Sequence, residues 1–263
     1  MQFSVLSSGS KANSTYLDTG SQRFLIDCGL SAKQTTQRLI SLGIDPNTID
    51  AIFVTHEHSD HIAGVPIFSK KYNVPVYANS ETAQFISGIE KLEIFITGEE
   101  ILIEGVSVRS FGIVHDAVDP VGFTISKDGF KFGQATDLGR ATIVVKEALK
   151  GSHALLLEAN HDLDMLYSSN YPWELKQRIS SSHGHLCNNV SAALLKDLAH
   201  SELVQVVLGH LSENCNTPEV ALKTINGYLD EAGHRLNIRC ASVQQPTELF
   251  SISQSLDRQV VNF

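Results

Sequence analysis

The segment THEHSDHIAG at residues 55–64 constrains the fold more than any other part of the sequence. Between His56 and His61 it carries three histidines and two acidic residues. It directly follows residues 49–54, IDAIFV, a short and mainly apolar run that is typical of a buried strand. Burying imidazoles and carboxylates without partners costs roughly several kcal/mol. A metal ion bound by these side chains is the simplest compensation.

Strand and helix patterns alternate along the chain. Short apolar runs bounded by Gly, Ser, Asn or Asp predict strands at residues 3–6, 14–18, 24–27, 51–55, 74–77, 101–111, 122–126, 131–135, 154–158, 203–208, 237–241 and 248–252. Longer amphipathic runs predict helices at residues 31–42, 62–72, 141–149, 173–180, 190–199 and 218–232. The Asp128-Gly129 pair indicates a tight hairpin, which excludes a purely parallel sheet. We therefore predict an α/β fold, a layered sandwich of mixed sheets, with residues 1–263 as one domain.

The composition, 42% hydrophobic and 19% charged, is that of an ordinary globular protein. Four scattered cysteines without a CxxC pair favour reduced thiols over a zinc knuckle or a disulfide framework. The N-terminus lacks the basic and apolar regions of a signal peptide, and no run approaches the length of a membrane span. We expect a soluble, cytoplasmic protein without a membrane partner.

The histidine segment has the spacing of a metal site. In an extended chain, side chains two residues apart point the same way, so His56 and His58 can hold one ion. Asp60 and His61 lie past a turn and can reach a second ion. The histidines suit Zn²⁺, the carboxylates also suit Mn²⁺, and Fe is a third candidate. Two ions about 3.5–4 Å apart can clamp a phosphoryl group, and they offer a chain of net charge −9 the local positive site that a phosphate substrate needs.

Three further residues of ligand type, His115, Asp137 and His210, follow predicted strands. Each lies where a strand leaves its sheet, and α/β proteins build their sites at such edges. A single histidine in such a place is more often a hydrogen-bonded structural residue. Three of them in addition to the histidine segment favour metal ligation.

These residues together resemble the metallo-β-lactamase superfamily. The resemblance rests on THEHSDH, on Asp27 in LIDCG upstream, and on the three downstream residues in the order of the family's motifs. It extends over nearly the whole chain. The resemblance implies a four-layer αββα sandwich of mixed sheets with two divalent metal ions at one edge.

The same resemblance implies a ligand set. The implied ligands of the first ion are His56, His58 and His115. The implied ligands of the second ion are Asp60, His61 and His210. Asp137 would bridge the two ions, and Asp27 would orient the histidine segment from outside the ligand set. Asp60 is also expected among the catalytic residues.

A narrower resemblance is to the YycJ (WalJ-type) branch of this superfamily. It rests on several motifs in one order: SVLSSGSKANS, FGIVHDA, TDLG, EANHD, YPWELKQRI, and HGHLCNN followed by SAALL. The branch implies a DNA 5′-to-3′ exonuclease in which a metal-bound hydroxide attacks phosphorus. The implied partner is nucleic acid, DNA in particular, and no organic cofactor is expected.

His185 and His161 are the other candidate catalytic residues. His185 precedes the helix predicted from residue 190, whose N-cap is expected at Asn188 or Asn189, and a helix N-terminus attracts phosphate. It resembles the histidine that related phosphodiesterases use to contact phosphate; a polar loop residue is the alternative. The segment EANHD, which contains His161, resembles the acid-plus-histidine loop of related nucleases, where the histidine would assist proton transfer. A purely structural role for His161 is the alternative.

The loop SSGS at residues 7–10 is a candidate for contact with substrate phosphate. Its backbone N–H groups can face an anion. Ser10 and the nearby Asn13 are the substrate-binding residues expected there. The alternative is a plain tight turn between two strands.

Other functions stay open for the same ligand set. A thioesterase of the hydroxyacylglutathione hydrolase type would use the ions on a carbonyl, and a small cyclic-nucleotide or nucleotide phosphodiesterase would use them on a smaller substrate. A metal-bound partner protein in envelope signalling is a non-enzymatic alternative, which an intact ligand set disfavours. The sequence has no GxSxG motif, no Walker motif and no cysteine nucleophile with a paired base, so nucleophilic serine or cysteine chemistry is not expected. The native metal, the choice between DNA and RNA and the oligomeric state stay open.

Overall fold

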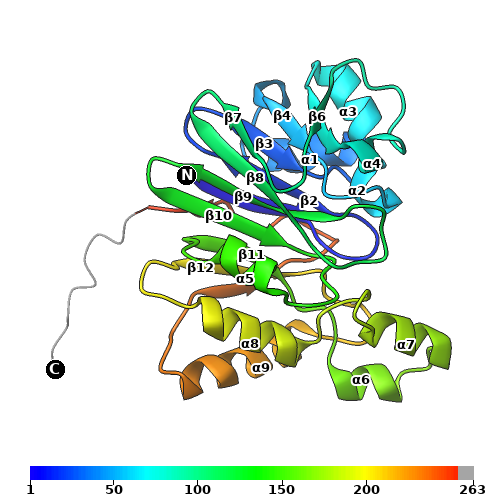
Figure 1. Ribbon diagram of the computed structural model, residues 1–263, viewed down its shortest axis with the longest axis vertical. Coiled ribbons are helices and arrows are strands. Elements are labelled where there is room, and N and C mark those ends of the chain that lie inside the picture. The colour runs from blue at the N-terminus through cyan, green and yellow to red at the C-terminus, as the bar shows by residue number, and fades with distance from the viewer. Residues whose placement is uncertain (254–263) are drawn as a thin grey trace, which may run out of the picture.

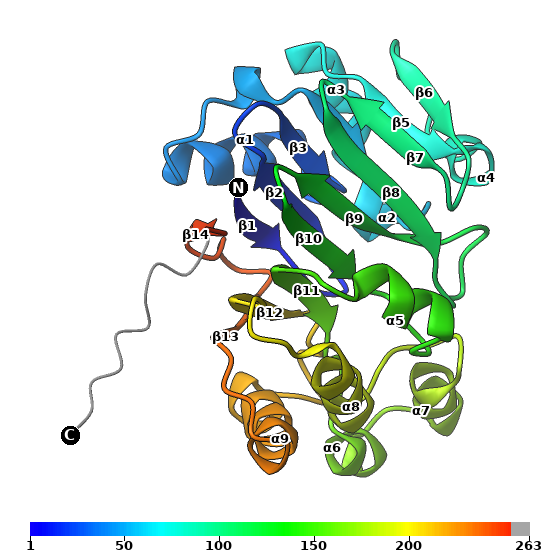
Figure 2. The ribbon, with the colours of Figure 1, turned by 60° about the vertical axis from the view of Figure 1, so that its left-hand side comes forward.

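The computed structural model describes residues 1–253. Two seven-stranded sheets pack face to face, and helices cover the outer face of each sheet (Figures 1 and 2). This four-layer arrangement confirms the predicted αββα sandwich of mixed sheets.

The first sheet combines antiparallel and parallel pairing. In spatial order its strands are β14 (Phe250–Ser251), β1 (Gln2–Ser7), β2 (Ser14–Asp18), β3 (Arg23–Ile26), β4 (Ala51–Phe53), β5 (Val76–Asn79) and β6 (Leu92–Phe95). The strands from β14 to β3 pair antiparallel, and those from β3 to β6 pair parallel.

The second sheet has the same division. In spatial order its strands are β13 (Ile238–Cys240), β12 (Gln205–Gly209), β11 (Ala154–Glu158), β10 (Phe130–Ala135), β9 (Val121–Lys127), β8 (Val106–Gly112) and β7 (Glu100–Ile103). The strands from β13 to β10 pair parallel, and those from β10 to β7 pair antiparallel. Within each parallel half the strands end at one edge of the sheet.

The helices form the two outer layers. Those beside the first sheet are α1 (Ala32–Ser41), α2 (Ser59–Ile62), α3 (Val65–Tyr72) and α4 (Ser80–Ala83), with a 3-10 turn at Pro46–Thr48. Those on the side of the second sheet are α5 (Ile143–Leu149), α6 (Leu163–Ser168), α7 (Trp173–Ser180), α8 (Asn188–Leu198) and α9 (Pro218–Glu231).

Phenylalanine rings fill the space between the sheets. Phe3 and Phe53 of the first sheet contact Phe132 and Phe123 of the second, with ring centroids 4.9 and 5.6 Å apart. All four rings are fully buried. Burying one such ring contributes about 1.5–3 kcal/mol, so this layer fixes the two sheets, and therefore the site at their edge, relative to each other.

The strand predicted at residues 101–111 is a hairpin of two strands, β7 and β8. The chain turns at Glu104 and Gly105, which both have positive φ (48° and 76°). This turn was not predicted because it lacks the Asn-Gly or Asp-Gly pair that marks most two-residue hairpins. A glutamate in the left-handed region is also uncommon. The elements β6, α4 and α6 have no predicted counterpart; β6, for example, exposes part of three of its four residues.

The helix predicted at residues 62–72 corresponds to α3, which begins at Val65; Ile62 instead ends α2, and Gly64 lies between the two helices. A side chain there would collide with the backbone, because a Cβ on Gly64 would lie 2.0 Å from the carbonyl oxygen of Leu30. The close approach packs α2, which carries part of the histidine segment, against the loop after β3.

The helix predicted from residue 190 begins at Asn188. Its N-cap is Cys187, which makes no side-chain hydrogen bond to the helix, so the expected cap at Asn188 or Asn189 is wrong. Asn188 is fully buried, and its amide exchanges hydrogen bonds of 3.0 and 2.9 Å with that of Asn216. The first turn of α8 therefore lacks the side-chain acceptor that usually satisfies its N–H groups.

All four cysteines are free, as predicted, and only Cys240 is partly exposed. Within residues 1–253, no helix combines the length and the apolar character needed to cross a membrane.

Candidate metal centre

The centre lies where the parallel strands of both sheets end. The residues that follow or complete these strands are Asp27 after β3, His56 after β4, Asp137 after β10, Glu158 at the end of β11 and His210 after β12. His115 comes from the loop after β8, and His185 comes from the loop before α8. Because parallel strands end together, the topology gathers side chains that are far apart in the sequence.

Asp27 holds the histidine segment in place. Its fully buried carboxylate accepts hydrogen bonds from the backbone N–H and the hydroxyl of Thr55, each at 2.8 Å. The same carboxylate lies 2.8 Å from Nδ1 of His61. This contact directs Nε2 of His61 toward the centre of the cluster.

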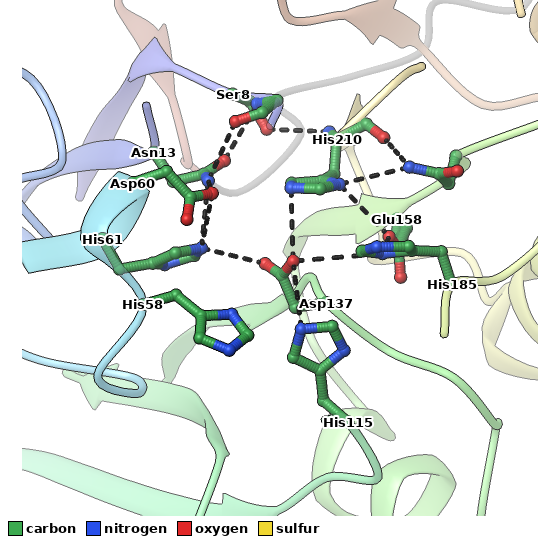
Figure 3. Close-up of polar contacts among 12 residues, drawn as sticks. Ser8, Asn13, His58, Asp60, His61, His115, Asp137, Glu158, His185 and His210 are labelled. Atoms are coloured by element: carbon green, nitrogen blue, oxygen red, sulfur yellow. Dashed lines mark hydrogen bonds and ion pairs between the residues drawn. The ribbon is translucent and has the colours of Figure 1, made fainter. Parts of the chain in front are cut away.

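Asp137 lies in the middle of the cluster (Figure 3). Its side chain is almost fully buried, and Oδ2 is 3.1 Å from Nε2 of His61. Oδ1 is 3.2 Å from Nε2 of His210 and 3.8 Å from Nε2 of His115. One carboxylate therefore faces imidazoles from both sheets.

Among the described residues, five overlapping groups of three side chains in this cluster can each hold a cation, and two of them match the ligand sets that the resemblance implied. Within each group the ligand atoms lie within 4.8 Å of one another. The first matching group is His56, His58 and His115. The second matching group is Asp60, His61 and His210. The structure thus brings together both of the ligand sets that the resemblance implied, with Asp137 beside members of each.

The donors of this cluster fit divalent metal ions. Oδ2 of Asp137 and Nε2 of His210 are buried, and although each lies within ion-pair distance of a neighbour, neither makes a hydrogen bond of acceptable geometry. A buried polar atom in this state costs about 1–3 kcal/mol, and a bound cation would satisfy both atoms. Imidazole and carboxylate donors together suit Zn²⁺, Mn²⁺ or Fe.

The charges of the cluster shift its pKa values in opposite directions. Burial raises the pKa of Asp137, but the imidazoles of His210 and His61 outweigh burial and hold that pKa well below its ordinary value. Burial lowers the pKa of His210, but Asp137 and Glu158 raise it to about 9. Burial, with the charge of His61, lowers the pKa of His56 well below its ordinary value. Without metal, Asp137 is therefore charged, and His210 carries a proton near pH 7 while His56 does not.

Glu158 is a site residue that the sequence analysis missed. Its fully buried carboxylate accepts a hydrogen bond from Nδ1 of His185 at 2.7 Å and lies 3.4 Å from Nδ1 of His210. It also accepts the backbone N–H of Leu138 at 2.6 Å. Glu158 ends β11 beside the strands that lead to Asp137 and His210, and that shared edge was the signal that could have found it.

The cluster opens into a cavity of about 430 Å³. Ser10, Asp60 and His185 are among the residues that line it. Asn13 does not line this cavity: it is buried, and its Nδ2 donates to Oδ2 of Asp60 at 3.0 Å. His161 also lies outside it and lines a separate cavity.

The fold and this histidine-rich edge define a class of metal-dependent hydrolases. The model of the metallo-beta-lactamase superfamily matches residues 8–144, and the chain belongs to this superfamily. Exodeoxyribonuclease YycJ of Bacillus anthracis is 37% identical over 239 residues, which cover 89% of this chain and 90% of that protein. Exodeoxyribonuclease WalJ of Streptococcus pneumoniae is also 37% identical over 239 residues, which cover 88% and 89%.

Solved structures of low identity share the fold. The metallo-beta-lactamase fold protein YhfI from Bacillus subtilis has a TM-score of 0.72 and 15% identity, and the match covers 94% of this chain and 98% of that chain. Human tRNase Z, short form, has a TM-score of 0.66 and 17% identity, with 96% and 100% covered. These matches support the αββα sandwich alone.

Metal binding should compete with protons. In the metal-free protein His210 carries a proton up to about pH 9, and the carboxylates of Asp27 and Asp137 outweigh burial and raise the pKa of His61 well above its ordinary value. A metal ion must displace these protons, so its affinity should rise about tenfold per pH unit for each proton displaced. Competition with a chromophoric chelator for Zn²⁺, between about pH 7 and pH 9, measures this slope. An affinity that does not change over this range contradicts the assignment of His210 and His61 as ligands.

Proposed function

We propose that the chain, as one hydrolase domain, is a dinuclear metal-dependent phosphodiesterase that acts as a DNA exonuclease from 5′ to 3′. One ion would be held by His56, His58 and His115. The other would be held by Asp60, His61 and His210, with Asp137 shared between them. Bound at these positions, divalent ions supply Lewis acidity that activates water and neutralises charge on the phosphoryl oxygens.

The observation that carries this proposal is the contact between His185 and Glu158. The imidazole of His185 lines the cavity, and its Nδ1 donates to the buried carboxylate of Glu158 at 2.7 Å. The carboxylate fixes the proton on Nδ1, as acids do for catalytic histidines elsewhere. The ring can then carry a second proton at Nε2 and give it to the oxygen that leaves phosphorus.

A proton donor beside the ligand groups favours phosphodiesters over thioesters. A thiol has a pKa of about 8.5, so its thiolate is a weak base that can leave without being protonated. A sugar alkoxide is a far stronger base and gains from a general acid. The His185–Glu158 pair is therefore useful for the first reaction and idle in the second, which argues against the thioesterase alternative.

Two arguments support DNA ends as the substrate. The first is the similarity to relatives named exodeoxyribonucleases over most of the chain; the 5′-to-3′ polarity follows from the YycJ resemblance alone. The second is the net charge of −9. Wrapping a duplex needs many Lys and Arg contacts with phosphates, so this chain suits a short contact in which the metal centre holds the phosphates of a strand end.

Replacing His185 with Ala should lower kcat on a phosphodiester about tenfold or more, the scale of lost proton transfer. Metal content should stay near two ions per chain. The matched control is His183→Ala, because His183 also lines the cavity but is exposed and has no acidic partner. Elemental analysis and steady-state kinetics measure both quantities. Loss of metal in the His185 variant alone would make His185 a ligand and require a different site.

Linear duplex DNA labelled at one 5′ end should release mononucleotides or short oligonucleotides from that end in Mn²⁺. A covalently closed circle should resist, because it offers no end, and Asp60→Ala should abolish the release. Gel analysis of both substrates over the same time course decides the matter. Steady linearisation of the circle that depends on Asp60 would show an endonuclease, and thioester turnover without any DNA cleavage would restore the thioesterase.

A further inference from the structure

A second cavity, of about 210 Å³, shares His185 with the metal cavity. Its walls come from the loop after Asp137, from the end of α7 and from the first turn of α8. A group bound there would lie beside a phosphate in the metal cavity, since both would contact the same imidazole.

The walls of this second cavity combine apolar and polar side chains. Leu163, Leu186 and Val190 provide apolar surface, Ser181 and Ser182 provide hydroxyl groups, and Arg140 provides a guanidinium. Binding sites for small organic groups have this character, with a few placed polar groups among apolar walls.

His161 adds a polar group with an unsatisfied atom. It is 1% exposed and lines this cavity, and its Nε2 has no hydrogen-bond partner. Asn160 fixes the tautomer: its Nδ2 donates to the carbonyl oxygen of His210 at 2.8 Å, so its Oδ1 faces Nδ1 of His161 at 3.2 Å and accepts the proton there. Nε2 therefore carries a lone pair and no hydrogen. Burial lowers the pKa of His161 to about 4, which keeps the ring neutral near pH 7.

A bare, buried nitrogen requires a hydrogen-bond donor. A second phosphate could pair with Arg140, but it presents only acceptors when it is fully ionised, so it would leave Nε2 of His161 without a donor. A nucleobase suits the whole cavity, because its pairing edge carries N–H groups and its faces pack on apolar side chains. The hydroxyls of Ser181 and Ser182 can donate to, or accept from, the remaining polar atoms of such a ring.

We propose that this cavity binds the unstacked base of the nucleotide next to the phosphate in the metal cavity. A base N–H donates to Nε2 of His161, and the ring lies against Leu163 and Val190. The inference rests on the proposed nuclease function and adds its substrate contact. It also gives a reason for action at ends, because a terminal base has one stacked neighbour and unstacks at lower cost than an internal base.

Filling the cavity tests the proposal. Val190→Trp places an indole at the mouth of the cavity, at the third position of α8, and 42% of Val190 is already exposed. Val220→Trp is the matched control, because Val220 holds the same position in α9 and does not line the cavity. The measured quantity is kcat/KM on duplexes labelled at the 5′ end. One duplex has normal bases throughout, and the others carry an abasic tetrahydrofuran unit at the first or at the second nucleotide. Bis-p-nitrophenyl phosphate serves as a substrate without a base.

The wild type should lose about tenfold or more in kcat/KM when one of the two positions is abasic, the scale of one lost base contact. Val190→Trp should lose a similar factor on the normal duplex. It should lose less than about twofold on the abasic duplex and on bis-p-nitrophenyl phosphate, since the contact is already absent there. Val220→Trp should match the wild type throughout. Equal losses of Val190→Trp on normal and abasic ends, or no loss on either, overturn the base pocket while the nuclease function stands.

Failure of the nuclease function is recognised separately. If the wild type cleaves no DNA, the three proteins are compared by their affinity for 2-aminopurine deoxyribonucleoside monophosphate, measured by fluorescence. Weaker binding by Val190→Trp than by Val220→Trp then supports the pocket. Equal binding by the three proteins, or no binding by any of them, overturns it.

Discussion

The carboxylate of Asp137 is the constraint on which the rest of the site depends. It is buried, and imidazole nitrogens of His61, His210, His115 and His185 lie between 3.1 and 3.9 Å from its oxygens. An isolated carboxylate at this depth would be neutralised, and neighbouring imidazoles would repel one another if all were protonated. Divalent ions held by these donors would remove both costs, so the residues of the cluster fit a metal centre better than a plain polar core.

The backbone is shaped to serve this cluster. Asp27, Asp137 and His210 each follow a strand and adopt positive φ, at 60°, 56° and 54°. For residues other than glycine this conformation costs about 1–3 kcal/mol, and it persists because each side chain is engaged. Asp27 accepts three contacts from the histidine segment, while His210 and Asp137 face each other across the end of β11, which lies between β12 and β10. The phenylalanine layer between the sheets keeps these strand ends in place.

The fold and the proposed ligands were predictable because their signals are local. Apolar strand patterns followed by His or Asp can be read directly from the chain, as at Asp137 and His210. Glu158 was missed because it completes an apolar strand, and its partner His185 lies 27 residues away. Asn13 was expected to face substrate, whereas its position depends on a contact with Asp60, 47 residues away. Such roles follow from tertiary packing, which the pattern of one segment does not contain.

The metal content of Asp137→Asn tests the central claim most directly. A neutral amide cannot join two cations as a carboxylate does, so the variant should keep its fold, by circular dichroism, and bind about one ion per chain or none. The control Asp116→Asn, at an exposed residue that lines the same cavity and pairs with Arg178, should retain about two ions. Two ions bound to Asp137→Asn with unchanged affinity, and activity within about threefold of the parent, a difference under about 1 kcal/mol, would contradict a centre built around this carboxylate.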